Sequence, residues 1–422
     1  MTDTLSRTSI IDSKRLWADL MSIAEFTEPD VPYTRRSFSP LFCQARAWLT
    51  KQFADAGFAT QVDSAGNLIG RLQGTEPTLG TIMIGSHSDT VSGGGRFDGV
   101  AGVIAALEIG RSLKAKAGSQ PLRHNLEIVD FLAEEPNAFG LSCVGSRGIS
   151  GALSAEMLAY KEPGGETLGA AIARVGGSPD KIPKAKRDDV KAFFELHIEQ
   201  GPVLEMESLD IGVVTAIVGI RRIEIMFHGE ANHAGTTPMH MRRDSAAAAA
   251  ESMVLIRKLA EQFAQQGDGH FVATIGIVEN YPNAANVVPE KTRLVIDARS
   301  ENRPIMEKFY DVVDRETSAI ASALRVKRDP LNVLSDSMPS LCDPALRSLL
   351  SASAIKLGYS NREMASGAGH DCAFMTRISS SAMVFVPCRS GRSHASEEWA
   401  EPDALALGAA TIADAIAKLD VQ

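Results

Sequence analysis

A switch in the pattern of apolar runs constrains the fold of this chain more than any other sequence feature. Up to about Leu209, apolar runs of strand length alternate with segments of helical periodicity. The expected strands cover residues 81–86, 126–133 and 192–199, and the expected helices include residues 16–24, 42–56 and 100–114. Strands that alternate with helices form a mostly parallel sheet with helices on both faces. The first half is therefore predicted to be an α/β domain.

The middle of the chain has a different pattern of strands and helices, and the first pattern returns after it. The runs 213–218, 222–228, 271–278 and 293–298 are expected to be strands of a separate antiparallel sheet. Asp244 is placed to N-cap a helix over 245–265, and Pro304 suits the first turn of a helix over 304–323. The α/β pattern returns with helices at 344–357 and 402–419 and a strand at 382–386. We expect a discontinuous α/β catalytic domain, residues 1–212 and 329–422, interrupted by an α+β domain, residues 213–328.

Composition excludes several classes of protein. A formal net charge of −9 argues against nucleic acid as the main partner. No apolar run approaches the ~20 residues of a membrane span, and the segment 1–7 lacks the apolar core of a secretory signal. The five cysteines are widely spaced and form no C-x-x-C motif, which suits a reducing compartment. We expect a cytoplasmic protein.

Two adjacent carboxylates, Glu134 and Glu135, stand where the apolar run 126–133 ends, and Pro136 cannot continue a strand's hydrogen-bond ladder. Neighbouring residues of a strand point to opposite sides. One carboxylate can therefore face a metal ion while the other faces a substrate. Taken alone, the pair fits a solvated acidic turn better.

Histidines and aspartates follow other expected strand ends. His87 comes directly after a strand and can present one ring nitrogen to a metal, while Asp89 could accept the N–H of the other ring nitrogen. An Asx turn explains the segment equally well. Asp98 closes the glycine-rich segment 93–99, where it could N-cap a helix or bridge two cations with its two oxygens. The glycines match neither the dinucleotide nor the P-loop pattern. His394 lies in a loop beyond the strand 382–386, where a histidine is usually a surface residue.

The strand 192–199 places Glu195, His197 and Glu199 on one face. Three polar groups on one face of a central strand are unfavourable unless they are paired or metal-bound. Five candidate ligands result: His87, Asp98, Glu135, His197 and His394. Five suffice for two catalytic ions if one carboxylate bridges, because each ion needs about three protein ligands. A hydroxide between ions ~3.5–4 Å apart would be the nucleophile, with Glu134 as general base.

These segments, in this order, resemble the M20 metallopeptidase superfamily of binuclear metallohydrolases. The segment 229–239, Gly-Glu-Ala-Asn-His-Ala-Gly-Thr-Thr-Pro-Met, narrows the resemblance to the hydantoinase/carbamoylase branch, which includes N-carbamoyl-L-amino acid hydrolases and allantoate amidohydrolases. The resemblance implies hydrolysis of the C–N bond of an N-carbamoyl-L-amino acid to the amino acid, CO₂ and ammonia. It also implies two divalent ions per subunit (Zn²⁺, or Mn²⁺, Co²⁺ or Ni²⁺) and an inserted domain that acts as lid and dimerisation domain.

The resemblance also assigns roles to single residues. The five ligands hold the metals, with Asp98 bridging, and Glu134 is the general base. His233 polarises the scissile carbonyl and reaches the site of the partner subunit in a homodimer. Gln200 is a candidate contact for the ureido group, and Asn286 with Arg299 would hold the substrate carboxylate. His370 follows glycines whose N–H groups could approach a carboxylate, which makes it a further candidate on the substrate side.

Other functions stay open at this point. Allantoate or ureidoglycolate is the alternative substrate, and N-acyl amino acids or peptides come third. The segments 136–147 and 289–291 depart from the forms common in the branch, which weakens any choice of one substrate. A binding protein that has lost activity would lack a ligand, and none is missing. A dehydrogenase built on the glycine-rich segment would bind a nicotinamide.

Overall fold

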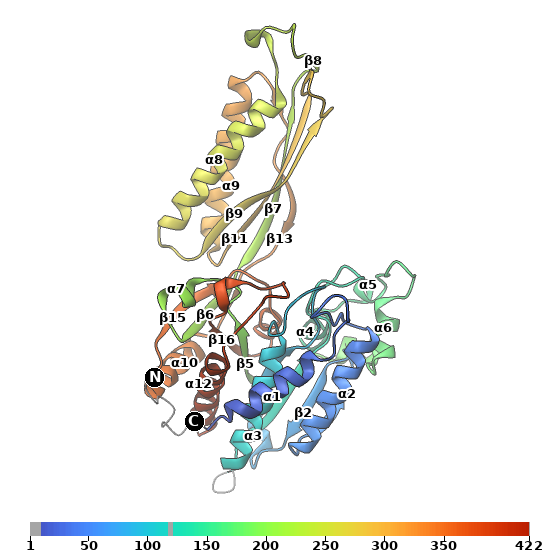
Figure 1. Ribbon diagram of the computed structural model, residues 1–422, viewed down its shortest axis with the longest axis vertical. Helices are drawn as coiled ribbons and strands as arrows, with labels where there is room; N and C mark the ends of the chain where they lie inside the picture. Colours follow the sequence, from blue (N-terminus) through green and yellow to red (C-terminus); the bar gives the residue numbers. More distant parts are fainter. Residues whose placement is uncertain (1–9, 117–120, 422) are drawn as a thin grey trace. The chain divides into compact units, whose positions relative to one another are not determined.

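The computed structural model describes residues 10–116 and 121–421, which form two compact units (Figure 1). The first unit contains the chain up to Thr215, Cys342–Met364 and the chain from Gly369 onward. The second contains Ala216–Leu341 and Ala365–Ala368. The segment 1–7, on which the prediction of no secretory signal rests, lies outside the described residues. Within them, no helix combines the length and hydropathy needed to cross a bilayer.

The first unit contains a nine-stranded sheet in the order β1-β2-β4-β3-β5-β16-β6-β14, with β15 also paired to β6. Its strands are β1 Ala59–Val62, β2 Leu68–Leu72, β3 Thr81–His87, β4 Asn125–Phe131, β5 Val190–Ile198, β6 Ile211–Ile217, β14 Ser340–Leu341, β15 Asn361–Ser366 and β16 Ser380–Val386. The four central strands β4, β3, β5 and β16 run parallel, while β2 and β6 flank them antiparallel. The predicted mostly parallel sheet is confirmed.

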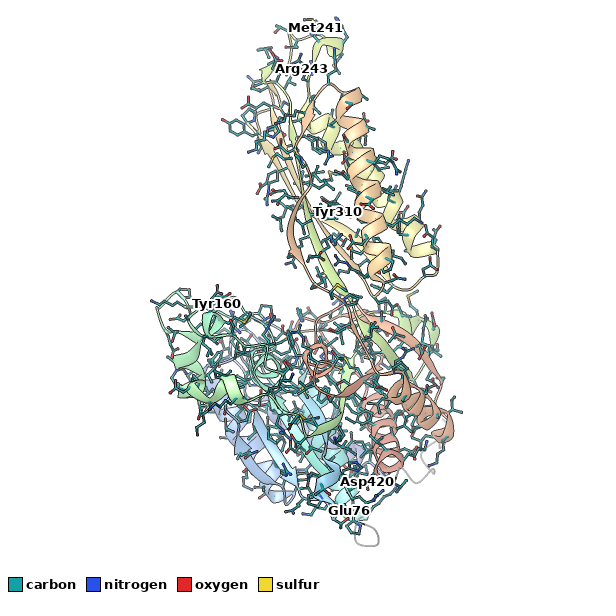
Figure 2. The ribbon with its side chains drawn as sticks, turned by 180° about the vertical axis from the view of Figure 1, so that it is seen from behind. Glu76, Tyr160, Met241, Arg243, Tyr310 and Asp420 are labelled. Atoms are coloured by element: carbon teal, nitrogen blue, oxygen red, sulfur yellow. The ribbon has the colours of Figure 1, made fainter. Side chains whose placement is uncertain are left out.

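Helices cover this sheet because its central strands are apolar on both faces. The longer helices are α1 Ser13–Ala24, α2 Pro40–Asp55, α3 Val100–Lys116, α10 Pro344–Leu357 and α12 Pro402–Asp420. The largest core joins them to alternate residues of the strands, such as Phe194 and Leu196 of β5, whereas Phe193 packs against Phe131 on the other side. Asp420, labelled in Figure 2, is the last residue of α12. It accepts the N–H groups of Arg123 and His124 and so links α12 to the start of β4.

Short elements complete the first unit. They are the α-helices α4 Val144–Ile149, α5 Ala155–Leu158, α6 Leu168–Arg174, α7 Val203–Glu207 and α11 Cys372–Met375, and the 3₁₀ turns η1 Pro77–Leu79, η2 Pro179–Lys184 and η4 Arg389–Gly391. A second, smaller core lies between α4, α6 and the loop after β4, and it includes Leu132 and Phe139. This core supports the loop that carries the two adjacent glutamates.

The second unit is an antiparallel sheet with two long helices. Its strands are β7 Gly219–His228, β8 Asn232–His233, β9 Phe271–Tyr281, β10 Val287–Val288, β11 Lys291–Ser300, β12 Lys327–Arg328 and β13 Asn332–Asp336; its helices are α8 Ser245–Gln265, α9 Arg303–Ala323 and the turn η3 Met239–Met241. β7 pairs with β11, β12 and β13, and β11 pairs with β9, whereas β8 and β10 form a separate two-stranded sheet. One face of the sheet and the two helices share a core around Phe227 and Phe309. The predicted antiparallel sheet and two helices are confirmed.

The prediction for residues 213–218 was wrong. This segment, β6, pairs antiparallel with β16 in the sheet of the first unit, with Val213 opposite Val384. Its Ile211 and Val213 are buried in the large core. The second unit also continues past the expected boundary at 328, because β12 and β13 both pair with β7.

Candidate active site

The candidate ligands gather at the carboxyl ends of the parallel strands. His87 is the last residue of β3, His197 lies in β5, and Glu135 follows β4. His394 is in the loop beyond β16, and Asp98 lies two residues before α3. Since β4, β3, β5 and β16 are parallel neighbours, their carboxyl ends open at one edge of the sheet, where ligands of such sheets bind.

The five side chains form two groups that share one aspartate. The ligand atoms of His87, Asp98 and His197 lie within 4.8 Å of one another, as do those of Asp98, Glu135 and His394. Asp98 Oδ1 is 3.1 Å from His197 Nε2, and Asp98 Oδ2 is 2.9 Å from His394 Nε2. The two oxygens of Asp98 therefore face different groups, as a bridging carboxylate requires.

The chemistry of these groups fits divalent cations. Glu135 Oε1 is buried without a hydrogen-bond partner, although His394 Nε2 lies 3.4 Å away. Burial raises the pKa of Glu135 to about 7, and Asp98 adds to the rise. A hydrogen bond with Asp98 raises the pKa of His394 to about 9. Buried carboxylates that crowd one another are stabilised by positive charge, and nitrogen with carboxylate oxygen is a common donor set for catalytic metals.

The buried histidines are oriented as metal ligands. His87 Nδ1 lies 3.0 Å from the main-chain oxygen of Asp89, and His197 Nδ1 lies 2.9 Å from that of Ile198. A carbonyl oxygen only accepts, so each Nδ1 donates, and when the ring is neutral its Nε2 keeps a lone pair for a metal. The Gly99 N–H, which donates to His197 Nε2, agrees with this tautomer. Burial lowers the pKa of His87, yet Glu134 and Asp89 hold it well above its usual value.

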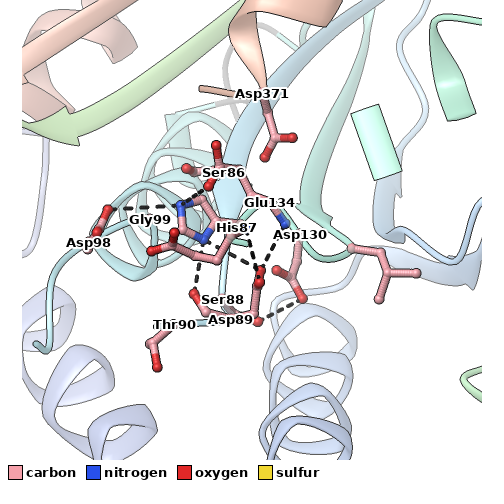
Figure 3. A network of polar contacts seen from close by, with 12 residues as sticks. Ser86, His87, Ser88, Asp89, Thr90, Asp98, Gly99, Asp130, Glu134 and Asp371 are labelled. Carbon is pink, nitrogen blue, oxygen red and sulfur yellow. Dashed lines mark hydrogen bonds and ion pairs between the residues drawn. The ribbon is translucent and has the colours of Figure 1, made fainter. Parts of the chain in front are cut away.

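The carboxylate of Asp89 was one candidate acceptor for the His87 ring N–H. Its Oδ1 is 3.6 Å from Nδ1, and the main-chain oxygen of Asp89 makes that contact instead. Its Oδ1 accepts the N–H group of Glu134 at 3.2 Å (Figure 3). Its Oδ2 accepts the N–H group of Glu135, also at 3.2 Å. Asp89 therefore fixes the backbone of the glutamate pair.

Glu134 is buried beside the two groups. Its Oε2 is 3.6 Å from His87 Nε2, and its Oε1 accepts the Cys143 thiol at 3.3 Å. Burial raises the pKa of Glu134 well above its usual value, His87 opposes the rise, and Asp371 adds to it. A raised pKa of this kind favours a carboxyl group that takes up and returns a proton during a reaction.

Sequence reasoning missed several buried groups around this cluster. Asp371 accepts the Ser146 hydroxyl at 2.5 Å through Oδ1, while its buried Oδ2 has no hydrogen-bond partner. Cys143 and Glu398 were not assigned either. Asp371 directly follows His370, whereas Cys143 is nine residues from Glu134 and Glu398 is four residues from His394. Such spacing in the sequence does not show which side chains touch the site.

The candidate substrate residues of the first unit lie close to the candidate metal ligands. Gln200 donates through Nε2 to Asp98 Oδ2 and to Ser393 Oγ, each at 3.1 Å. The ring centroid of His370 is 4.5 Å from that of His197. Glu199, expected on the polar face of β5, instead accepts the N–H groups at the start of α7. Its charge is used to cap that helix.

The remaining candidates lie at two ends of the second unit. His233 in β8 pairs with Val287, and the main-chain oxygen of Asn286 accepts the Ala234 N–H at 2.9 Å. Arg299 lies near the other end of β11, where it donates to the Gly367 oxygen at 2.7 Å. At ~3.3 Å per residue, β11 separates these ends by roughly 26 Å. One chain therefore brings His233 and Asn286 together and holds Arg299 apart from them.

Comparisons with known proteins identify the family of this chain. The profile of "Peptidase family M20/M25/M40" matches residues 83–418. The chain is 35% identical over 98% of its length to the ureidoglycolate hydrolase of Oryza sativa subsp. japonica, of which it covers 86%. It is 34% identical to the N-carbamoyl-L-amino-acid amidohydrolase of Paenarthrobacter aurescens, over 97% of this chain and 98% of the relative. It is also 35% identical to the allantoate amidohydrolase of Escherichia coli (strain K12), over 92% of each.

A solved structure extends the likeness to the whole fold. The hydantoinase/carbamoylase family amidase of Burkholderia multivorans superposes with a TM-score of 0.91 at 32% identity, over 99% of this chain and 100% of that one. Family and relatives together support a hydrolase acting on C–N bonds. The chain belongs to the peptidase family M20/M25/M40, as its motifs predicted.

Proposed function

We propose that this protein is a metal-dependent amidohydrolase that cleaves the C–N bond of N-carbamoyl-L-amino acids, releasing the amino acid, CO₂ and ammonia. The observation that carries the proposal is the pair of ligand groups joined by Asp98, with the buried carboxyl of Glu134 beside them. The relatives named N-carbamoyl-L-amino-acid amidohydrolase support the choice of substrate.

His87, Asp98 and His197 would hold one divalent cation, and Asp98, Glu135 and His394 would hold a second. Zn²⁺, Mn²⁺, Co²⁺ and Ni²⁺ all suit imidazole nitrogen and carboxylate oxygen. When bound, such ions polarise a carbonyl group and lower the pKa of water, so that a nucleophile is present at neutral pH.

Glu134 is the proposed proton carrier. Its Oε2 side faces His87, and its raised pKa suits a group that takes a proton from the attacking water and returns it to the leaving nitrogen. Asp89 fixes its main chain, and the Cys143 thiol donates to its other oxygen. Gln200, which donates to Asp98, would contact the ureido group, and His370, whose ring lies beside that of His197, would contact the carboxylate of the substrate.

The second unit would complete the site through a homodimer. A ureido acid is far smaller than the separation between His233 and Arg299, so contact with both requires two copies of the chain. β9 supports association, because among the described strands it pairs with β11 alone and leaves its outer edge open. It exposes Val272, Ile277, Val278 and Tyr281. A long apolar edge of this kind is normally paired or covered.

Allantoate or ureidoglycolate is the second candidate substrate. Relatives with these names match the chain at 35% identity, no less than the carbamoylases do. Both molecules combine a ureido group with a carboxylate, so they would use the same residues. An N-acyl amino acid or peptide, without a ureido group, is the less favoured alternative.

Ammonia release tests the proposal. The metal-free protein is reconstituted separately with each of the four ions and given N-carbamoyl-L-amino acids, allantoate or ureidoglycolate. Hydrolysis of an N-acetyl amino acid yields acetate and no ammonia, so that substrate is followed by the free amino acid it releases. Ammonia from the N-carbamoyl-L-amino acids supports the main proposal. Ammonia from allantoate or ureidoglycolate alone makes that molecule the substrate instead. Glu134→Gln keeps the shape of the side chain, so it should retain the metals and lose about 10²–10⁴-fold in kcat. No ammonia from any pairing contradicts the proposal.

A further inference from the structure

A buried carboxylate outside the proposed ligand set joins the two loops that meet at the metal centre. The Glu398 side chain is 1% exposed. Its Oε1 accepts the N–H groups of Phe97 at 2.7 Å and Asp98 at 3.1 Å. Its Oε2 accepts the Ser393 hydroxyl at 2.8 Å. One side chain thereby links the shared ligand Asp98 to the residue directly before His394, across 300 positions of sequence.

Neighbouring residues pack closely around the Glu398 side chain. A Cβ on Gly95 would lie 2.4 Å from Glu398 Oε1, and Gly95 has φ +96°, so a glycine is required there on both counts. Phe97 and Trp399, the neighbours of the two linked segments, pack edge to face with ring centroids 5.7 Å apart. The carboxylate is therefore held by both loops, and each loop is held by the carboxylate.

The two ligand groups differ in how their histidines are supported. His87 and His197 belong to β3 and β5, and main-chain carbonyl groups orient their rings. His394 lies in a loop, with its side chain 50% exposed and φ at 55°. Its ring faces Asp98 and Glu135, so its distance from Asp98 depends on where the Ser393–His394 turn is held.

We propose that Glu398 is a positioning residue for the group formed by Asp98, Glu135 and His394. It holds the Asp98 main chain and the Ser393–His394 turn at the separation that one cation spans. The group of His87, Asp98 and His197 depends on it much less, because two of its three ligands stand on strands. This inference rests on the two-ion centre of the proposed function and adds to it a residue that sets the affinity of one site.

Metal affinity of each site, measured by chelator competition with Zn²⁺ on the metal-free full chain, tests the proposal. Glu398→Ala should weaken one of the two sites about 10–100-fold, as loss of an outer partner of a metal ligand does, while the other changes less than about threefold. Glu398→Gln keeps an oxygen for the Phe97 and Asp98 N–H groups and should lose less. Glu397→Gln is the matched control, because Glu397 is exposed and undergoes the same change of charge.

A second variant keeps the test decisive if Glu398→Ala does not fold, which circular dichroism of the metal-free protein reveals. Ser393→Ala removes the hydroxyl link to Glu398 and should weaken the same site in the same direction. Unchanged affinities in Glu398→Gln and Ser393→Ala, or an equal loss at both sites, would overturn the inference and leave the proposed function standing. Wild-type protein that binds no ion would contradict both the inference about Glu398 and the proposed function.

Discussion

Mixing two inactive variants tests whether one catalytic site draws on two chains. His233→Ala and Arg299→Ala each remove one proposed substrate contact, so each homodimer lacks that contact at both of its sites. Between the two positions in one chain lies the part of β11 from Lys291 to Arg299, which spans roughly 26 Å at ~3.3 Å per residue. If a site takes Arg299 from the chain that holds the metals and His233 from its partner, a mixed dimer has one intact site and one that lacks both residues.

The size of the recovery follows from this arrangement. Random exchange makes half of the dimers mixed, and each has one active site of two, so an equimolar mixture should regain about a quarter of wild-type activity in a two-fold dimer. Ammonia release before and after subunit exchange measures it. His233→Ala mixed with Asn286→Ala is the control, because both residues lie at the same end of the second unit and no mixed site regains both. No recovery in the first mixture, or equal recovery in the two, refutes the reasoning.

Two further predictions follow from the structure. Val278→Lys places a charge on the exposed edge of β9 and should weaken self-association at least about tenfold, a difference of about 1.4 kcal/mol, without changing the fold, as sedimentation and circular dichroism can show. Hydrogen bonding by Arg187 lowers the pKa of Asp189 to about 2, below the ~3.9 of an unfolded aspartate. Its stabilising contribution is therefore complete above pH ~4 and is lost as the pH falls toward 2. The difference in unfolding free energy between wild type and Asp189→Asn, from urea titrations at pH 5 and pH 3, should shrink with acid; a difference that grows would contradict this.

Local sequence signals predicted some elements well. The helix expected at 245–265 is α8 with the same bounds, because the Asp244 side chain caps it and an alanine run continues it. The failure at β6 has a physical cause. Its apolar pattern is the same whichever sheet it joins, and only pairing with β16, far along the chain, decides between the two.

The candidate site, like the fold, was predictable from the sequence only in part. Residue types at strand ends predicted which side chains would meet, because parallel strands share one carboxyl edge. Hydrogen-bond partners at the level of single atoms were not predictable. The spacing of His87 and Asp89 does not tell whether the main-chain oxygen or the carboxylate accepts the ring N–H. Nor do the neighbours Glu397 and Glu398 differ in sequence, although one is exposed and the other is buried between two loops.

Metal stoichiometry tests the central claim most directly. Elemental analysis of protein prepared without chelator should find two divalent transition ions per chain, one after His394→Ala, and none bound tightly after Asp98→Ala, because both ligand groups share Asp98. Removing the ions with a chelator should abolish ammonia release, and adding them back should restore it. A chain that holds no transition ion and gains no activity from any of them would contradict the account.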